Sequence, residues 1–317
     1  MRFGSDVLWS NYMKSLPRPL GTLKFLLAWL TPWRPVFGIR AGRWNLAFFA
    51  HYRDAVGRHI AKYGTHEPLV TQWLNNYLNV AAPGIVVDVG ANLGWHTLHA
   101  AQHPNVEAVA AFEPDLFNAS LLDRSLSKNN VDKVIVIVSA VGAESGVGRF
   151  FRYRNSNYGR HTLITDYGYG SRSVPVVNLD GALSNLGFQD RPISVIKIDV
   201  EGYEPAVIAG AASSLTRAEA VIIEYSPNIS QAGGLSTDEM LNRLNAVGFT
   251  PFALLSGGGT VRLTAEDLRS LKGSLDIIWF REDRATPDTI AAMSIRDRGK
   301  LTLLEIAEQN KRVVTPL

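Results

Sequence analysis

Ile85-Val86-Val87-Asp88-Val89-Gly90-Ala91-Asn92-Leu93-Gly94-Trp95-His96 is the stretch that indicates the fold most clearly. Its first five residues are mostly apolar and β-branched, which predicts a strand buried on both faces. A glycine turn follows, and then Trp95, Leu98 and Ala101 recur at helical spacing. A strand, a glycine turn and a helix make the first half of a βαβ unit, whose turn can hold a nucleotide-like ligand.

The spacing of the turn is Asp-x-Gly-x-x-x-Gly, from Asp88 through Gly90 to Gly94, whereas dinucleotide sites use Gly-x-Gly-x-x-Gly. Gly90 can adopt a positive φ without steric cost, and Gly94 lets a ligand or a neighbouring backbone approach closely. The start of the helix offers free N–H groups to an anion. A purely structural turn is the alternative interpretation.

A second predicted strand, 108–112, ends at Glu113, which lies 25 residues after Asp88. An acid that closes the second strand of such a fold is placed to accept hydrogen bonds from ribose hydroxyls. The glycine turn and this acid together predict a cofactor of the adenosine type.

Three motifs resemble those of the FkbM family of S-adenosylmethionine-dependent methyltransferases. They are residues 87–94, the Phe112-Glu113-Pro114 segment, and Ile196-Lys197-Ile198-Asp199-Val200-Glu201-Gly202-Tyr203-Glu204. The resemblance extends from about Gly64 to about Phe280, and the last motif is the most specific. It implies an α/β fold of the Rossmann-like class I methyltransferase type. We therefore expect a mostly parallel seven-stranded sheet with helices on both faces and S-adenosylmethionine as the cofactor.

The resemblance also implies which residues hold the cofactor. The glycine turn would hold the methionine part, Glu113 the ribose, and the end of the strand 134–138 the adenine. Glu67 is expected to face the pocket, although pairing with a helix dipole is an equal alternative. The expected cofactor-binding residues are Glu67, Asp88, Gly90, Asn92, Gly94, Glu113, Ser139, Ala140 and Asp199.

Methyl transfer to a hydroxyl needs collinear reactants and the removal of a proton. His161 is the first candidate base, since an ordinary histidine pKa of ~6.5 suits proton abstraction near neutrality. Asp199 or Glu201 could act instead, or could hold a divalent ion, but Asp-x-Glu is weak evidence and we expect no metal. A lysine within a buried strand needs a partner. The expected catalytic group is Asp199, Glu201, His161, Lys197 and Glu224.

The loop 157–163 is similar to the Asn-x-Gly-x-x-Ser-Leu segment of the family, with Thr162 in the place of serine. The loop is rich in Tyr and Arg, which could stack on and hydrogen-bond a sugar. We expect it to form the wall of the acceptor site. A surface loop without function is the alternative.

The net charge of +3 hides an asymmetry along the 317-residue chain. Residues 1–62 carry ten Lys or Arg against two Asp or Glu, a net charge of +8; the rest carries 22 against 27, a net charge of −5. The chain has no cysteine, which excludes a disulfide scaffold and thiolate metal sites. We expect a cytoplasmic protein, with membrane association as an option.

Three regions are predicted: a basic, Trp-rich helical extension (1–62), a methyltransferase domain (63–282) and a C-terminal helical extension (283–317). Within the first, helices are expected at Thr22–Leu30 and Asn45–Lys62. A basic segment with tryptophans could lie on a membrane surface, so residues 1–40 are a candidate for peripheral membrane contact. A packing arm or a contact between copies in a homo-oligomer is the other interpretation.

These observations predict an S-adenosylmethionine-dependent O-methyltransferase acting on a hydroxyl of a sugar, a glycan or a polyhydroxylated natural product. A non-catalytic protein that keeps the fold for binding or assembly is the first alternative. A nicotinamide-dependent oxidoreductase is disfavoured by the glycine spacing. No nucleic-acid partner is expected, because no RNA-binding motif is present and the body of the chain is acidic.

Overall fold

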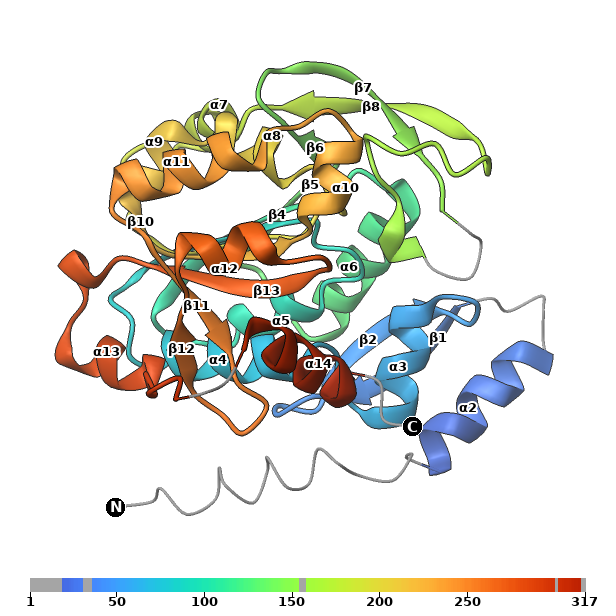
Figure 1. Cartoon of the computed structure of the whole chain (residues 1–317). Helices are drawn as coiled ribbons and strands as arrows, with labels where there is room; N and C mark the ends of the chain where they lie inside the picture. The colour runs from blue at the N-terminus through green and yellow to red at the C-terminus, as the bar shows by residue number, and fades with distance from the viewer. Residues whose placement is uncertain (1–18, 31–35, 154–157, 300–301, 315–317) are drawn as a thin grey trace.

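The computed structural model describes residues 19–30, 36–153, 158–299 and 302–314. Its centre is an eight-stranded sheet (Figure 1). In spatial order the strands are β12 (Thr260–Arg262), β11 (Thr250–Leu254), β13 (Leu275–Phe280), β10 (Ala218–Tyr225), β9 (Ile193–Ile198), β3 (Gly84–Val89), β4 (Val106–Phe112) and β5 (Val134–Ile137).

The sheet is mostly parallel, as predicted. The strands from β10 to β5 pair in parallel, and β13 is antiparallel to both of its neighbours, β10 and β11. The seven predicted strands are all present. The eighth, β12, is a short edge strand that pairs antiparallel with β11 and was not expected from the sequence. The Rossmann-like fold is therefore confirmed, with one strand added at its edge.

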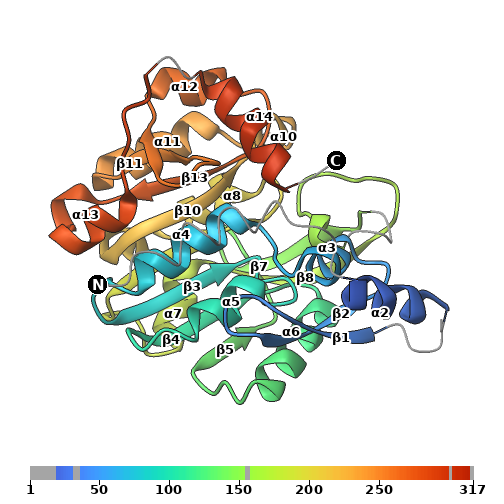
Figure 2. The same ribbon diagram turned by 90° about the horizontal axis from the view of Figure 1, so that it is seen from below.

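Helices cover both faces of the sheet (Figures 1 and 2). Alternate residues of each central strand point to opposite faces: Val87 packs in one core and Val86 in the other. The face of Val86 is covered by α4 (Pro68–Leu78), α5 (Trp95–Ala100), α6 (Leu116–Lys128) and α13 (Pro287–Met293). The face of Val87 is covered by α7 (Leu179–Asn185), α8 (Glu204–Ala209), α9 (Ala212–Arg217), α11 (Thr237–Val247) and α12 (Ala265–Ser270). The remaining helices are α10 (Pro227–Ala232), α14 (Leu303–Val314) and the 3-10 turn η2 (Glu282–Arg284).

The predicted helix Asn45–Lys62 is wrong. Residues Leu46–His51 form strand β2, which pairs antiparallel with β1 (Val36–Ala41), and helix α3 covers only Ala55–Tyr63. Asp54 starts α3 by accepting a hydrogen bond from the N–H of Gly57. The periodicity of the apolar residues fitted a helix, but pairing with β1 satisfies the backbone of β2, and Phe48 is fully buried. The N-terminal region therefore contains a β-hairpin as well as helices.

The hairpin is attached to the main domain through helix α6. The side chains of Asn129 and Ser125 accept hydrogen bonds from the backbone N–H groups of Ala47 and Phe49. Helix α2 (Pro19–Leu30), close to the predicted Thr22–Leu30, packs against α3 and β1. Trp9 and Trp33 lie outside the described residues. The region boundaries at 62 and 282 stay predictions.

A second, three-stranded sheet lies beside the carboxyl ends of the central strands. It is formed by β6 (Ala140–Val141), β8 (Ser171–Val177) and β7 (Gly146–Phe151), and the loop between β7 and β8 contains the 3-10 turn η1 (Tyr158–Arg160). Among the described helices, none is both long and apolar enough to cross a membrane.

Candidate active site

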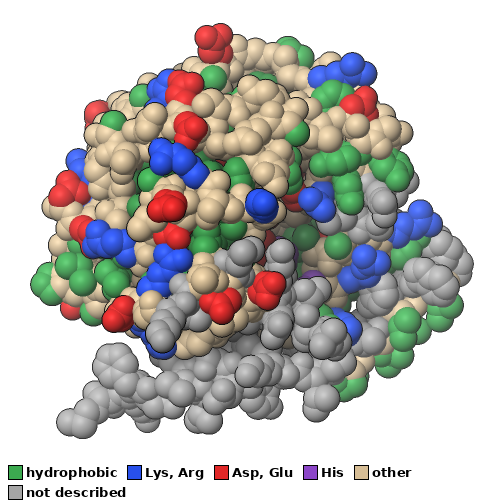
Figure 3. Space-filling model, in the orientation of Figure 1, with side chains coloured by type: hydrophobic (Ala, Val, Ile, Leu, Met, Phe, Trp, Pro, Cys, Tyr) green, Lys and Arg blue, Asp and Glu red, His purple; other side chains and the backbone are tan. Residues whose placement is uncertain are grey.

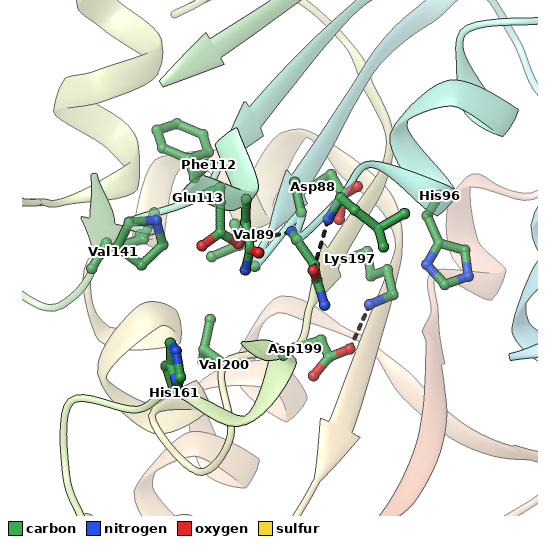
Figure 4. Close-up of a pocket in the computed structure, with 18 of the residues that line it drawn as sticks. Asp88, Val89, His96, Phe112, Glu113, Val141, His161, Lys197, Asp199 and Val200 are labelled. Carbon is green, nitrogen blue, oxygen red and sulfur yellow. Dashed lines mark hydrogen bonds and ion pairs between the residues drawn. The ribbon is translucent and has the colours of Figure 1, made fainter. Parts of the chain in front are cut away.

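One pocket opens at the carboxyl ends of β3, β4 and β9 (Figure 4). Its volume, including the solvent-filled space at its open mouth, is about 820 Å³. Most of the predicted cofactor residues line it: Glu67, Asp88, Gly90, Asn92, Glu113, Ser139, Ala140 and Asp199. Lys197 and His161 line it too, whereas Gly94, Glu201 and Glu224 do not.

The two glycines of the turn have different surroundings. Gly90 has a φ of 86°, and a Cβ there would lie 1.9 Å from the carbonyl oxygen of Asp199. Only glycine therefore lets the ends of β3 and β9 approach this closely. Gly94 has a φ of 88°, and its open side is filled by the side chain of Leu122 on α6. Gly94 serves helix packing, so the expectation that it allows a ligand to approach is not met.

Glu113 is buried at the end of β4 and its carboxylate is held by backbone donors. The N–H of Asn92 donates to Oε2 and the N–H of Asp115 to Oε1, both at 2.8 Å. Asn92 itself has a φ of 52°, and its side chain accepts a hydrogen bond from the N–H of Leu93. Burial raises the pKa of Glu113 to about 7 in spite of these bonds.

At the other side of the pocket, Lys197 pairs with two carboxylates, and Figure 4 shows its contact with Asp199. Its Nζ lies 2.8 Å from Oδ2 of Asp199 and 3.8 Å from Oε2 of Glu67. Burial by itself would lower the pKa of Lys197, but Asp199, Glu67 and Asp88 outweigh it and raise that pKa. Burial raises the pKa of Asp88, with Lys197 and Thr97 partly offsetting it. The buried Lys197 thus has two carboxylate partners, Asp199 and Glu67.

Glu67 occupies the N-cap of α4 in the left-handed region, with a φ of 40°, and its side chain caps no helix N–H. The carboxylate of Glu67 lies 3.2 Å from Nε2 of His66 and 3.6 Å from Nε2 of His96. Burial opposes its ionisation, but Lys197 and His66 hold the pKa of Glu67 well below its usual range. Glu67 thus faces the pocket instead of pairing with a helix dipole.

The sequence did not indicate that His66 and His96 reach this pocket. His96 was expected to pack or to be exposed; it is buried beside Glu67 and Thr71. Burial holds the pKa of His96 well below the ordinary histidine value. The one sequence signal that could have placed His96 at the pocket is its position in the first helical turn after Gly94.

Three buried polar atoms at the pocket have no hydrogen-bond partner within the described chain: Oδ1 of Asp88, Oε2 of Glu67 and Oγ of Ser139. Such atoms are costly unless a ligand or water satisfies them. Two are carboxylate oxygens, which need donors, and one is a hydroxyl. The pocket therefore fits a polar ligand that carries amino or hydroxyl groups.

The loop that bears His161 closes one wall of the pocket. Nδ1 of His161 accepts a hydrogen bond of 2.9 Å from the N–H of Tyr153, which places the ring proton on Nε2. Burial lowers the pKa of His161. The hydroxyl of Thr162 donates to the carbonyl oxygen of Glu201 at 3.0 Å, which ties this loop to the motif after β9. Asn157 lies outside the described residues.

Glu201 and Glu224 lie behind the wall of the pocket. Oε2 of Glu201 is 3.3 Å from Nε of Arg160, and burial together with Asp199 raises the pKa of Glu201 to about 7. Glu224 on β10 lies opposite Asp276 on β13 in the register of these two antiparallel strands. Burial and neighbouring acids raise the pKa of both carboxyls well above the ordinary value. Asp276 was missed from the sequence, because only the register of the two strands places it opposite Glu224.

The described residues contain no group of three or more His, Asp or Glu side chains arranged to hold a metal ion. Their carboxylates instead pair with Lys197, Arg160 and backbone N–H groups.

A mostly parallel sheet in which β13 runs against both of its neighbours, a glycine turn after β3 and a buried acid after β4 together define a Rossmann-like methyltransferase. The model of the Methyltransferase FkbM domain matches residues 88–251. The chain belongs to the FkbM methyltransferase family.

Among the curated proteins, the chain is similar to the hexuronic acid methyltransferase AglP of Haloferax volcanii. The two are 30% identical over 142 residues, which is 44% of this chain and 55% of that protein. The chain thus spans about half the length of this relative.

Among solved structures, the chain is similar to an S-adenosylmethionine-dependent methyltransferase from Agrobacterium tumefaciens. The identity is 11% and the TM-score 0.43, over 78% of this chain and 71% of that one. An S-adenosylmethionine-dependent O-methyltransferase from Thermotoga maritima matches with 14% identity and a TM-score of 0.36, over 69% and 67% of the two chains.

Proposed function

We propose that this methyltransferase methylates a hydroxyl oxygen of a sugar, in a glycan or in a polyhydroxylated natural product. The observation that carries the proposal is the loop of His161, which lines the pocket through Gly159, His161 and Thr162 and also carries Tyr153 and Arg160. Arg160 lies over the ring of Tyr153, 5.1 Å from its centre, and forms the ion pair with Glu201. Aromatic faces and arginine donors suit a polyhydroxylated ring. The similarity to a hexuronic acid methyltransferase supports a sugar acceptor.

The cofactor side of the pocket would bind S-adenosylmethionine through groups that remain available for it. The carboxylate of Glu113 accepts two backbone N–H groups and the side chain of Asn118, and would use its remaining lone-pair capacity for a ribose hydroxyl. Ser139 and Ala140 would contact the adenine, and Asp88 and Asn92 the methionine part. When bound, the cofactor supplies an electrophilic methyl group on a positively charged sulfonium. Four acids line the pocket with one lysine, a charge balance that suits a cationic ligand: Glu67, Asp88, Glu113, Asp199 and Lys197.

For the proton of the acceptor hydroxyl we favour Glu201 over His161. The lone pair of Nδ1 in His161 is engaged by the N–H of Tyr153, so this nitrogen is not available to take a proton from the acceptor. A glutamate with a pKa of about 7 is matched to proton abstraction near neutrality. Glu201 would need its bond to Arg160 to open towards the acceptor. Asp199, paired with Lys197, would then orient the acceptor, and Glu224 would tune the charge around Glu201.

Calorimetric titration with S-adenosylhomocysteine, with NAD as the control ligand, tests the cofactor side. Micromolar binding of the first alone is expected. Transfer of a labelled methyl group is then measured with neutral hexoses, hexuronic acids and their glycans. Transfer to a hydroxyl, identified from the methylated product, supports the proposal. Tight cofactor binding with no transfer to any of these acceptors would favour a binding or assembly protein. Methylation of the uronate carboxyl would overturn the hydroxyl assignment.

Glu201→Gln and His161→Gln separate the two candidate bases. We expect the first to lower kcat by about 10²–10⁴-fold without weakening cofactor binding, as loss of a general base does. The second should mainly raise KM for the acceptor. The reverse result would make His161 the base.

A further inference from the structure

Helix α2 carries a stripe of exposed leucines, which we call the leucine stripe. Leu20, Leu23, Leu27 and Leu30 follow the 3–4–3 spacing of one helical face, and Leu26 lies beside them. Their exposed fractions are 75%, 51%, 52%, 62% and, for Leu26, 47%. Isolated exposed leucines are ordinary, but a contiguous stripe of five on one short helix marks a contact surface.

The helix is held in place from its other side. It packs against α3 and β1, and Figure 1 shows it at the edge of the molecule beside α3. Figure 3 shows hydrophobic side chains gathered at the lower right edge, where α2 lies, with Lys and Arg side chains above them. The stripe therefore faces outward from a helix that the fold has already positioned.

The surroundings of the leucine stripe are basic. Residues 19–30 and 36–62 contain six Lys or Arg and one Asp, whereas residues 63–317 carry a net charge of −5. Arg40, Arg43, Arg53, Arg58 and Lys62 are all exposed on the hairpin and on α3. An apolar helical stripe with cations around it matches the interface of an anionic bilayer, where apolar side chains enter and the cations remain at the headgroups. Twelve residues are too few to cross a bilayer, so the helix would lie in its plane.

This surface is continuous with the active site. Helix α3, which packs against α2, also contacts the turn η1 of the acceptor loop, and Val56 of α3 lines the pocket. We propose that α2, with the exposed cations of β1, of α3 and of the turns on either side of β2, docks the enzyme on an anionic membrane surface. The acceptor loop is thereby held next to the headgroups. The proposal concerns docking alone and does not depend on which acceptor is methylated.

Flotation of the full chain with vesicles tests it. Binding to vesicles of phosphatidylcholine with phosphatidylglycerol should exceed binding to phosphatidylcholine alone by roughly tenfold or more, and should weaken as salt is raised. Replacing Leu20, Leu23 and Leu30 together by Gln should abolish binding without altering the charge. The matched control is Val147→Gln with Ile290→Gln, two other exposed apolar residues, 79% and 45% exposed, which should bind as the wild type does.

Titration with S-adenosylhomocysteine shows that each variant is folded, and it keeps a failure of docking distinct from a failure of the proposed function. Three results would overturn the proposal. They are no binding of the full chain to anionic vesicles, an equal loss of vesicle binding in both sets of variants, or equal binding to vesicles with and without phosphatidylglycerol. A wild-type dimer that the leucine substitutions convert to a monomer, without vesicle binding, would show instead that a second copy covers the stripe.

Discussion

The two sides of the pocket hold their carboxylates in different ways. Around Lys197, Glu67 and Asp199 are neutralised by a buried ammonium group. Across the pocket, Glu113 is held by two backbone N–H groups and the side chain of Asn118, with no cation paired to it among the described residues. The consequence is visible in the pKa values: that of Glu67 lies well below its usual range, whereas that of Glu113 is about 7.

Because of this difference, the stability of the fold and the binding of the ligand can be tested at separate residues. A buried ion pair leaves an uncompensated charge when one partner is removed, so a change at Lys197 should lower the free energy of unfolding. A carboxylate held by backbone donors can be changed without stranding a charge, so the Glu113 side can be probed through ligand binding.

The largest effect is expected for Lys197→Met. It leaves the partly exposed Asp199 and Glu67 without their cation, so the free energy of unfolding in urea should fall by about 3 kcal/mol, the lower end of the range for a broken buried ion pair. Lys272→Met, at an exposed lysine, is the control and should change little. A loss below about 1 kcal/mol for Lys197→Met would mean that the acids become protonated or hydrated at little cost.

Glu113→Gln should act on the ligand more than on the fold. Loss of a charged acceptor for the ribose hydroxyls should weaken S-adenosylhomocysteine binding by about 1–3 kcal/mol, roughly 5- to 150-fold. Calorimetry measures the change, with Glu266→Gln at an exposed glutamate as the control. Unchanged affinity would remove Glu113 from the ribose role.

The same residue predicts a pH dependence. The ionised carboxylate is the better acceptor, so wild-type affinity for S-adenosylhomocysteine should rise as the pH passes through about 7, and that rise should be absent in Glu113→Gln. For stability the sign is opposite. The folded state binds the proton more tightly than an unfolded glutamate with a pKa of 4.5, so the contribution of Glu113 to stability falls between pH 4.5 and about 7. A wild-type affinity that is flat with pH would contradict the assignment.

The smallest effect is expected for Ser139→Ala. The Oγ of Ser139 is buried without a partner in the described chain, so its removal should leave the stability of the free protein unchanged or slightly raised. Cofactor binding should weaken by about 0.5–1.5 kcal/mol if the hydroxyl bonds the adenine. Ser194→Ala, whose Oγ bonds the carbonyl oxygen of Ala82, is the control and should lose stability without losing affinity. Equal affinity of Ser139→Ala and wild type would place the adenine elsewhere.

The glycine turn and Glu113 were predictable because their signals are local. The glycine turn directly follows a β-branched run, Glu113 directly follows the next apolar strand, and the resemblance to the family rests on the same segments. Strand β2 was not predictable in this way. Its apolar spacing also fits a helix, and the residues that decide between the two lie in β1 and α6.

The sequence by itself thus determined the order of the main-sheet strands along the chain, the cofactor turn and the family, because short-range patterns encode them. Only the tertiary structure decided which charges meet. It placed Glu67 of the α4 N-terminus against Lys197 of β9, and Asp276 against Glu224, through contacts between residues far apart in the chain. It also engaged Nδ1 of His161 with the N–H of Tyr153, a geometry that no spacing of residues specifies. Burial and pairing, which set the pKa of each group, exist only once those segments are packed together.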